Sequence, residues 1–445
     1  MTAIPAEPPF ALRARILSPL ADGGLLDEPD GILEVDAAGH IARVARWDDA
    51  NSHAVLDLRP LVLMPGMVDL HAHLPQIPNA GLGSGLDLLT WLDRYIFPLE
   101  RAYDRSVAER QAPAAFRSFA AAGTTTVVAY AALWPESTDA AFVAAEAHGI
   151  RAVIGKVMMD RLSYDTEIAS SEILETSLRQ SDELATRWHG VDAGRLRYAF
   201  TPRFAVSCSA EMLRDSAALA TKHGAYWQTH LSEDADEIAE VARLFPEARD
   251  YLDVYDRAGA LGARTILAHA IHLSAREVDR LVEADARVAH CPASNLFLSS
   301  GMMPLGAHRA AGMTVGLGSD VAAGPELSML SVMRAGAATQ RVLELTGRAD
   351  PAAALRPLDW LRMGTLDGAR VLGMDAEIGS LEVGKEADMI VIDPRFTEPL
   401  PGEASPASAD EVAGRLVFRP HPEMVRAALV RGRLLAGPPG LDGIG

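Results

Sequence analysis

Cysteine and basic charge are both scarce in this chain of 445 residues. Its two cysteines, Cys208 and Cys291, are too few for a disulfide framework, and reduced thiols of this kind are typical of the cytoplasm. The 41 Lys and Arg residues are outnumbered by 60 Asp and Glu residues, which leaves a formal net charge of −19. A surface this acidic disfavours nucleic acid and anionic membranes as partners. We therefore expect a cytoplasmic enzyme with a small-molecule substrate.

Long apolar runs are also missing. No segment approaches the ~20 consecutive apolar residues that a membrane-spanning helix requires. Pro5, Pro8 and Pro9 interrupt the N-terminal stretch where a signal peptide needs its apolar core, so we expect no export. With 49% hydrophobic residues, the chain can still bury one large core and one smaller core.

Short apolar runs alternate with alanine-rich, helical stretches through the middle of the chain. These runs are 124–130, 152–159, 197–204, 225–231, 265–270, 286–292 and 313–320. Together with the strand before His71 they make eight strand–helix units over roughly 300 residues, as in a (β/α)₈ barrel of the TIM type. The sequence therefore predicts an α/β catalytic barrel over residues 65–376.

Both ends of the chain have the pattern of β structure instead. The expected strands are 10–20, two strands within 31–47, 387–393, and a hairpin over 426–435. The stretch 394–409, rich in Pro, Ser and Glu, is expected to be a surface loop. We expect residues 1–64 and 377–445 to form one composite β-sandwich domain.

His71 and His73 stand two residues apart in PGMVDLHAHLPQ (65–76), after the apolar stretch Leu61–Met64. Side chains two apart on an extended segment point to the same side, so both imidazoles can reach one point. Imidazole is a common metal ligand, and Asp69 is a candidate to support the pair by hydrogen bonding. The pair predicts half of a metal site.

Three further metal-type residues follow apolar strands. His230 ends the fifth predicted strand, His269 the sixth and Asp320 the eighth. The active site of a (β/α)₈ barrel gathers at the C-terminal ends of its strands, so these residues converge on one mouth. A single histidine is more often a structural residue. That alternative does not account for five residues of metal-ligand type, four histidines and one aspartate, that all follow predicted strands. The constellation indicates a metal-dependent hydrolase.

These residues together resemble the amidohydrolase superfamily and, within it, the guanine deaminase family. The narrower resemblance rests on HAHLPQ (71–76), LDLLTWLDRYIFPLE (86–100), GKVMMDR (155–161), TPRF (201–204), THLSE (229–233), AHCPASNLFLSSG (289–301) and GLGSDVAAG (316–324). It runs from about Leu61 to Gly384. It implies a (β/α)₈ barrel with a β-sandwich flank.

The resemblance implies one Zn²⁺ per subunit, held by His71, His73, His230 and Asp320, with His269 close to the reacting water. The same ligands can hold Fe²⁺. The implied catalytic residues are Glu233, Asp320 and His269: Asp320 accepts the water's proton, and Glu233 moves a proton to the ring under attack. The alternative for Glu233 is an acid at the start of the following helix, where it would favour the helix dipole.

The resemblance also implies a set of substrate-binding residues. They are Gln76, Arg203, Phe204, His230, Glu233 and Asp320. Arg203 can only donate hydrogen bonds and suits the carbonyl oxygen of a purine lactam, whereas Gln76 offers both a donor and an acceptor. Phe204 supplies an apolar wall or backbone contacts. Trp91 and Phe97, in the segment after the first strand, form either a lid or ordinary packing.

The implied activity is metal-dependent hydrolytic deamination of guanine to xanthine and ammonia, in purine catabolism, by a homodimer. One alternative is the same chemistry on another nitrogen heterocycle, such as a pterin, 8-oxoguanine or a triazine. A remote alternative is a non-catalytic assembly protein on an amidohydrolase scaffold. This chain retains all of the expected ligands and Glu233, which disfavours that alternative.

The chain departs from the family pattern in three places. It has AHA (268–270) where the family usually has AHG, and GSD (318–320) where the family favours GTD. FRPHPEMVRA (418–427) replaces an LGDDR-like segment. If this last segment touches the substrate mouth or a subunit interface, both substrate range and assembly are affected.

Overall fold

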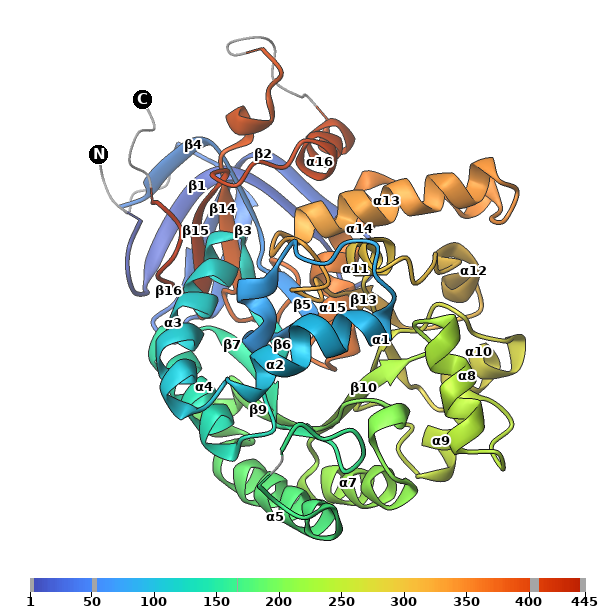
Figure 1. Ribbon diagram of the computed structural model, residues 1–445. Coiled ribbons are helices and arrows are strands. Elements are labelled where there is room, and N and C mark those ends of the chain that lie inside the picture. The colour runs from blue at the N-terminus through green and yellow to red at the C-terminus, as the bar shows by residue number, and fades with distance from the viewer. Residues whose placement is uncertain (1–3, 50–53, 166, 401–407, 441–445) are drawn as a thin grey trace.

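The computed structural model describes residues 4–49, 54–165, 167–400 and 408–440. A nearly closed parallel barrel forms one body, and a separate sheet built from both chain ends packs beside it (Figure 1). The predicted fold class is confirmed. The exact domain boundaries 1–64, 65–376 and 377–445 stay predictions.

Eight parallel strands make the barrel in sequence order, and β8 (Val157–Met158) pairs with β9 beside them. The eight strands are β5 (Met67–His73), β6 (Thr124–Tyr130), β7 (Arg151–Gly155), β9 (Leu196–Pro202), β10 (Tyr226–Leu231), β11 (Thr265–His269), β12 (Arg287–His290) and β13 (Val315–Leu317). Every residue of β5, β6 and β7 is buried. Strands covered on both faces are apolar throughout rather than alternating, which is why short apolar runs identified them.

Helices surround the barrel, and local capping sets where several of them begin. Ser209 caps α7 by accepting a hydrogen bond from the backbone N–H of Met212, and Gly224 ends this helix at a φ of 62°. Asp234 and Glu237 form a capping box at the start of α8. None of the helices within the described ranges is long and apolar enough to cross a membrane.

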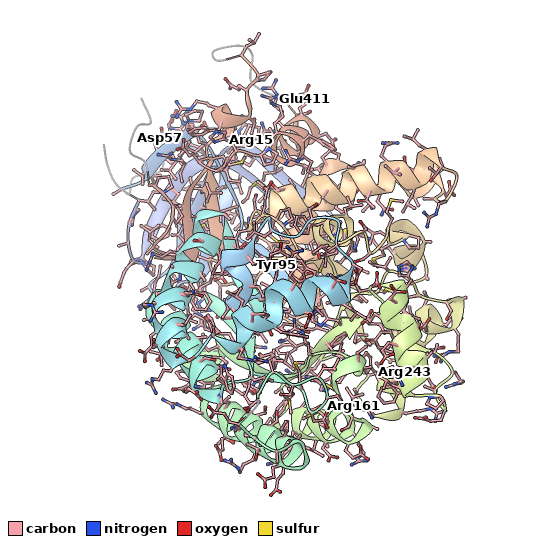
Figure 2. All side chains as sticks on the ribbon, viewed as in Figure 1. Arg15, Asp57, Tyr95, Arg161, Arg243 and Glu411 are labelled. Atoms are coloured by element: carbon pink, nitrogen blue, oxygen red, sulfur yellow. The ribbon has the colours of Figure 1, made fainter. Side chains whose placement is uncertain are left out.

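The helices between the strands and at the chain end have the following bounds: α3 (Arg105–Ala121), α4 (Pro135–His148), α5 (Ser170–Trp188), α6 (Val191–Gly194), α7 (Ala210–His223), α8 (Ala235–Leu244), α9 (Tyr251–Arg257), α10 (Ala275–Glu283), α11 (Pro292–Phe297), α12 (Leu305–Ala310), α13 (Met329–Leu345), α14 (Pro357–Arg362), α15 (Gly368–Val371) and α16 (Ala409–Phe418). The segment after β5 is also helical, with η1 (Leu74–Asn79), α1 (Leu88–Trp91), the π-helical turn η2 (Leu92–Ile96) and α2 (Phe97–Arg101). In Figure 1 the blue α1–α2 segment crosses in front of the barrel, and the label on Tyr95 marks the same segment in Figure 2.

The second sheet joins the two chain ends, so that blue and red strands lie side by side in Figure 1. Its order is β16 (Arg433–Leu434), β15 (Val425–Val430), β14 (Met389–Ile392), β4 (Leu56–Pro65), β1 (Phe10–Pro19), β2 (Leu25–Val35) and β3 (Ile41–Arg46). β14 pairs antiparallel with β4, and β4 pairs parallel with β1. The expected composite β domain is thus built by pairing between remote segments.

Four details differ from the sequence-based expectations. The apolar stretch Leu61–Met64 belongs to β4 in the second sheet, and the first barrel strand is β5, which itself carries both histidines. Two buried strands separated by one glycine look alike as sequence, because both are apolar. The run 152–159 is divided into β7 and β8, and Asp320 lies three residues beyond β13. The expected loop 394–409 contains the short helix η6 (Pro394–Thr397), whereas 401–407 lie outside the described residues.

Arg151, at the start of β7, ties the barrel to the second sheet. Its side chain is fully buried, Nε donates to Asp388 Oδ2 at 3.0 Å, and Nη2 pairs with Glu386. Burial alone would lower the pKa of Arg151, but the two carboxylates raise it above its ordinary value. The guanidinium therefore stays charged and holds two buried or half-buried acids together.

Replacing Arg151 should destabilise the protein more than any surface ion pair does. We expect Arg151→Ala to lower the free energy of unfolding by about 3–5 kcal/mol, because Asp388 is left buried without its cation. Arg105→Ala breaks an exposed pair with Glu109 and should cost under about 1 kcal/mol. Urea unfolding followed by tryptophan fluorescence measures both. Equal effects of the two substitutions would contradict the assigned role of Arg151.

Candidate active site

Four side chains from the first, fifth and last parts of the barrel converge at its mouth. His71 Nε2 and His73 Nε2 lie 3.2 Å apart, and His230 Nε2 lies 3.4 Å from His73 Nε2. Asp320 Oδ1 is 3.2 Å from His71 Nε2 and 3.3 Å from His73 Nε2. The structure thus brings together the side chains that the sequence predicted to meet.

The seam between β5 and the segment after β13 places Asp320. Ser319 donates to Asp69 twice, from its backbone N–H at 2.9 Å and from Oγ at 2.6 Å. The Asp320 N–H donates to the His71 carbonyl oxygen at 2.7 Å, and the His71 N–H donates to Asp69 Oδ1 at 3.2 Å. Asp69 therefore supports the histidine pair through the backbone of His71 rather than through an imidazole ring. Burial raises the pKa of Asp69 to about 7.

Hydrogen bonds from behind orient the remaining donors. His230 Nδ1 donates to the Arg203 carbonyl oxygen at 2.6 Å, and His269 Nδ1 donates to Asn295 Oδ1 at 2.9 Å. Because Nδ1 carries the proton in each ring, Nε2 keeps its lone pair for the centre. Ser294 Oγ donates to Asp320 Oδ2 at 2.6 Å. Supporting contacts of this kind are what fix metal ligands in position.

The donor set fits a divalent metal ion. Two overlapping groups, His71–His230–His269 and His71–His73–Asp320, have their ligand atoms within 4.8 Å of one another. His269 Nε2 is buried and has no hydrogen-bond partner among the described residues. Burial lowers the pKa of His73 to about 4 and that of His230 well below its ordinary value, so both rings are neutral, as a ligand must be.

Backbone strain occurs where strands end at the site. His269 has a φ of 69°, Ala270 of 52° and Asp320 of 49°, all in the left-handed region that favours glycine. Ala270 is the residue that departs from the family's usual AHG, and its conformation explains why glycine is common there. An alanine in this conformation costs about 1–2 kcal/mol, which a large barrel can tolerate.

Glu233 follows β10 and faces the same centre. Its Oε1 accepts a hydrogen bond from Ser300 Oγ at 3.1 Å, and its Oε2 lies 3.4 Å from His269 Nε2. Burial raises the pKa of Glu233 well above its ordinary value. The helix-capping role falls to Asp234 and Glu237, which form the capping box of α8. The site-facing interpretation of Glu233 is therefore the one the geometry favours.

A pocket of about 350 Å³ lies over this cluster. Its lining consists of His73, Gln76, Leu88, Trp91, Leu92, Arg203, Phe204, His230, Glu233, His269, Leu298, Asp320 and Ala323. The α1–η2 segment thus supplies one wall, including Trp91. Phe97 instead packs its ring 5.4 Å from the Arg203 guanidinium carbon. None of residues 418–427 lines the pocket, and His421 and Met424 line a separate cavity against α3 and α13.

Sequence reasoning assigned no role to several residues that hold the site. Glu100, at the end of α2, accepts from Gln76 Nε2 at 2.8 Å and from Arg203 Nη1 at 2.5 Å. Ser294, Asn295 and Ser300 hold Asp320, His269 and Glu233 as described above. All four lie inside motifs that carried the family resemblance, and this was the one signal available, because a buried acid or amide has no periodic pattern of its own.

A buried donor cluster at the mouth of a (β/α)₈ barrel defines the class of metal-dependent hydrolases. The sequence matches the Amidohydrolase family over residues 62–435. Guanine deaminase of Escherichia coli (strain K12) is 37% identical over 375 residues, which cover 83% of this chain and 82% of that protein. The chain therefore belongs to the amidohydrolase family and, within it, to the guanine deaminase group.

Solved structures agree with this assignment. Guanine deaminase from C. acetobutylicum, with bound guanine in the active site, has a TM-score of 0.87 at 29% identity, covering 96% of this chain and 99% of that one. An adenosine deaminase from Xanthomonas campestris with bound Zn has a TM-score of 0.82 at 26% identity, covering 98% and 95%. The predicted resemblance is confirmed.

The donor cluster predicts a metal content that depends on its histidines. The purified protein should carry about one equivalent of a divalent ion, and the His71→Ala/His73→Ala protein should be folded but metal-poor. His290→Asn is the matched control, because His290 also ends a buried barrel strand but lies outside the cluster. Elemental analysis and circular dichroism measure both quantities. A double variant that retained its metal would overturn the ligand assignment.

Proposed function

We propose that this protein catalyses the hydrolytic deamination of guanine to xanthine and ammonia. The observation that carries the proposal is a single pocket lined both by Arg203 and Gln76 and by Glu233, Asp320 and His269. Arg203 and Gln76 offer the hydrogen-bond donors and acceptor that the lactam edge of a purine requires. Glu233, Asp320 and His269 are the acid–base groups that a hydrolytic centre requires. Its similarity to guanine deaminases over most of the chain supports the same conclusion.

We propose one Zn²⁺ per subunit, with His71, His73, His230 and Asp320 as its ligands and His269 beside them. Bound Zn²⁺ would lower the pKa of water and supply a nucleophile at neutral pH. Fe²⁺ remains the alternative for the same donors. The bound Zn of the Xanthomonas campestris adenosine deaminase favours zinc.

The chain's own residues account for the proton transfers. Water adds its oxygen to the ring carbon that bears the exocyclic amino group, and Asp320 accepts the proton that the water loses. Glu233, held by Ser300, gives its proton to the adjacent ring nitrogen, takes up the proton that Asp320 accepted and passes it to the departing amino group, which leaves as ammonia. The proton of the added hydroxyl group returns to Glu233 as the carbonyl group forms. The raised pKa of Glu233 suits a group that must carry a proton at neutral pH. His269 Nε2, 3.4 Å from Glu233 Oε2, would accept a hydrogen bond from the attacking water and so orient it.

Arg203, Gln76 and Phe204 would position the base. Only Nη1 of Arg203 donates to a described residue, so its other N–H groups are available to a carbonyl oxygen in the pocket that it lines. Gln76 donates to Glu100 and keeps its amide oxygen as an acceptor. Phe204 is buried and lines the same pocket, which gives the ring an apolar wall.

Other heterocycles of the deaminase type, such as a pterin, 8-oxoguanine or a triazine, are the second candidates. The triazine hydrolases are 20% identical to this chain and share only its fold. Ammonia release from a panel of these compounds beside guanine tests the choice. A non-catalytic scaffold role is disfavoured by the intact cluster and by the pocket above it. A cytoplasmic location and a homodimer belong to the same proposal, with size-exclusion chromatography as the test of assembly.

The role of Glu233 predicts a loss of turnover without a loss of metal. Glu233→Gln keeps size and polarity but removes the exchangeable acid proton, so kcat for guanine should fall by roughly 10²–10⁴-fold while metal content stays as in the parent. Asp236→Asn, at an exposed position three residues along, should change neither quantity. Steady-state ammonia assays and elemental analysis measure them. Loss of metal in the Glu233 variant would instead identify a ligand or a structural support.

Arg203 predicts discrimination between purines. Guanine has a carbonyl oxygen at position 6 where adenine has an amino group, and two opposed donors leave both without a partner. Sites built on such matching reject a mismatched analogue by roughly 10⁴-fold, so adenine should give little or no turnover.

Substitutions at Arg203 separate charge from shape. Arg203→Ala should lower kcat/KM for guanine by about 10²-fold or more. Arg203→Lys keeps the cation for Glu100 but loses the planar fork, and should fall between the parent and Arg203→Ala. Comparable rates on guanine and adenine, or a fully active Arg203→Ala enzyme, would overturn the assignment of Arg203 as the carbonyl reader.

A further inference from the structure

Glu100 bridges the two residues that would read the substrate, although it does not itself line the pocket. Its Oε1 accepts from Gln76 Nε2 at 2.8 Å, and its Oε2 accepts from Arg203 Nη1 at 2.5 Å. All three side chains are at most 3% exposed. Both Glu100 oxygens act as acceptors, which is the pattern of an ionised carboxylate. Arg203 and Glu100 thus form a buried cation–anion pair with no net charge.

The aromatic groups around this pair do not add a compensating charge. The other titratable side chains that line the same pocket as Arg203 are His73, His230, His269, Glu233 and Asp320, and a substitution of Glu100 leaves them unchanged. Phe97 covers the Arg203 guanidinium with an uncharged ring, 5.4 Å from the guanidinium carbon. Tyr164 lies next to Glu100, and the ring of Tyr130 packs against the rings of His71 and His73. Burial raises the pKa of each phenol well above its ordinary value. Both phenols therefore stay neutral. Burial alone would lower the pKa of Arg203, but Glu100 raises it. The pair is charged internally and neutral as a whole.

We propose that Glu100 is a positioning and specificity-determining residue that makes the site prefer a neutral lactam over an anionic one, and so favours release of the product. This inference rests on the proposed guanine deamination. Without Glu100, the Arg203 guanidinium would be a buried cation without a counter-ion. Such a cation binds an anion by a charge-assisted hydrogen bond. With Glu100 in place, an anionic ring gains little from Arg203 and lies in the field of a buried carboxylate.

The substrate and product differ in the property that this pair senses. Deamination replaces an amino-substituted ring carbon by a second carbonyl group. Each additional carbonyl spreads the charge left when a ring N–H is lost, so xanthine ionises at lower pH than guanine. The product is therefore the more anionic of the two at neutral and alkaline pH. Because the Arg203–Glu100 pair is neutral overall, it binds the neutral substrate without retaining the anionic product. The affinity for guanine then exceeds the affinity for xanthine, which favours turnover.

Inhibition by xanthine at two pH values tests the inference. In the parent enzyme the Ki of xanthine should rise as pH increases from about 6 to about 9, because its anion gains little from a neutral pair. In Glu100→Gln the Ki should fall over the same range, so that the Ki ratio of variant to parent drops by about tenfold or more. Other groups in the pocket, including the proposed metal centre, are the same in both enzymes, so their effect on the Ki cancels in this ratio. KM for guanine should rise as well, since Gln76 and Arg203 lose their common anchor.

Two further variants separate charge from fold. Glu100→Asp keeps the charge but shortens the reach, so it should raise KM while retaining the parent's pH trend for xanthine. Glu277→Gln removes another buried glutamate, one that caps α10, and should leave the xanthine Ki as in the parent. A Glu100→Gln enzyme with the parent's pH trend, or a Glu100→Asp enzyme with the trend of Glu100→Gln, would overturn the inference.

The same measurements distinguish failure of the inference from failure of the proposed function. A parent enzyme that released no ammonia from guanine would overturn the proposed function, and with it the basis for using xanthine. An active parent whose product inhibition is insensitive to Glu100 would overturn the charge role alone.

Discussion

The site depends on the hydrogen bonds that close the barrel between its first and last strands. β5 and β13 are the two ends of the strand order, and side-chain and backbone bonds from Ser319 and Asp320 join them. Ser319 satisfies the buried carboxylate of Asp69, and Asp320 is held by the backbone of His71. If this seam opened, Asp69 would lose its partners in a dry environment, and Asp320 would leave the histidines. The bonds that join β5 to the segment after β13 therefore also assemble the donor cluster.

Arg203 couples that centre to substrate recognition. Its carbonyl oxygen accepts from His230 Nδ1 and so turns Nε2 toward the other ligands, while its side chain lines the pocket. Glu100 extends the coupling to the α1–α2 segment, because this residue belongs to α2 and binds the Arg203 side chain. A shift of that segment would therefore disturb the reader before it disturbed the metal ligands. Recognition and catalysis share one rigid strand end, which holds both in register.

The features that could be predicted from the sequence were those marked by a regular pattern of apolar residues or by a fixed spacing of residues along a strand. Buried barrel strands are short and apolar, and a histidine pair two residues apart must share a face, so the barrel and the convergence of its metal-type residues followed from the pattern. Glu100 could not be found this way, because its partners are 24 and 103 residues distant in the chain. The boundary between β4 and β5 was missed for a related reason. Both strands are buried, and only pairing with β14 or with β6 distinguishes the sheets.

A position at the end of a barrel strand is nevertheless insufficient to bring a histidine into the donor cluster, as His290 demonstrates. It ends β12 at the same barrel rim and is fully buried, but it belongs to neither donor group. Burial lowers its pKa to about 3, so the ring is neutral, and neither ring nitrogen has a hydrogen-bond partner among the described residues. His230 and His269 differ in having an acceptor at Nδ1, which directs Nε2 inward. A hydrogen bond behind the ring thus distinguishes His230 and His269 from His290. His73 joins the donor cluster without one, because its position two residues after His71 on β5 brings both Nε2 atoms to the same point.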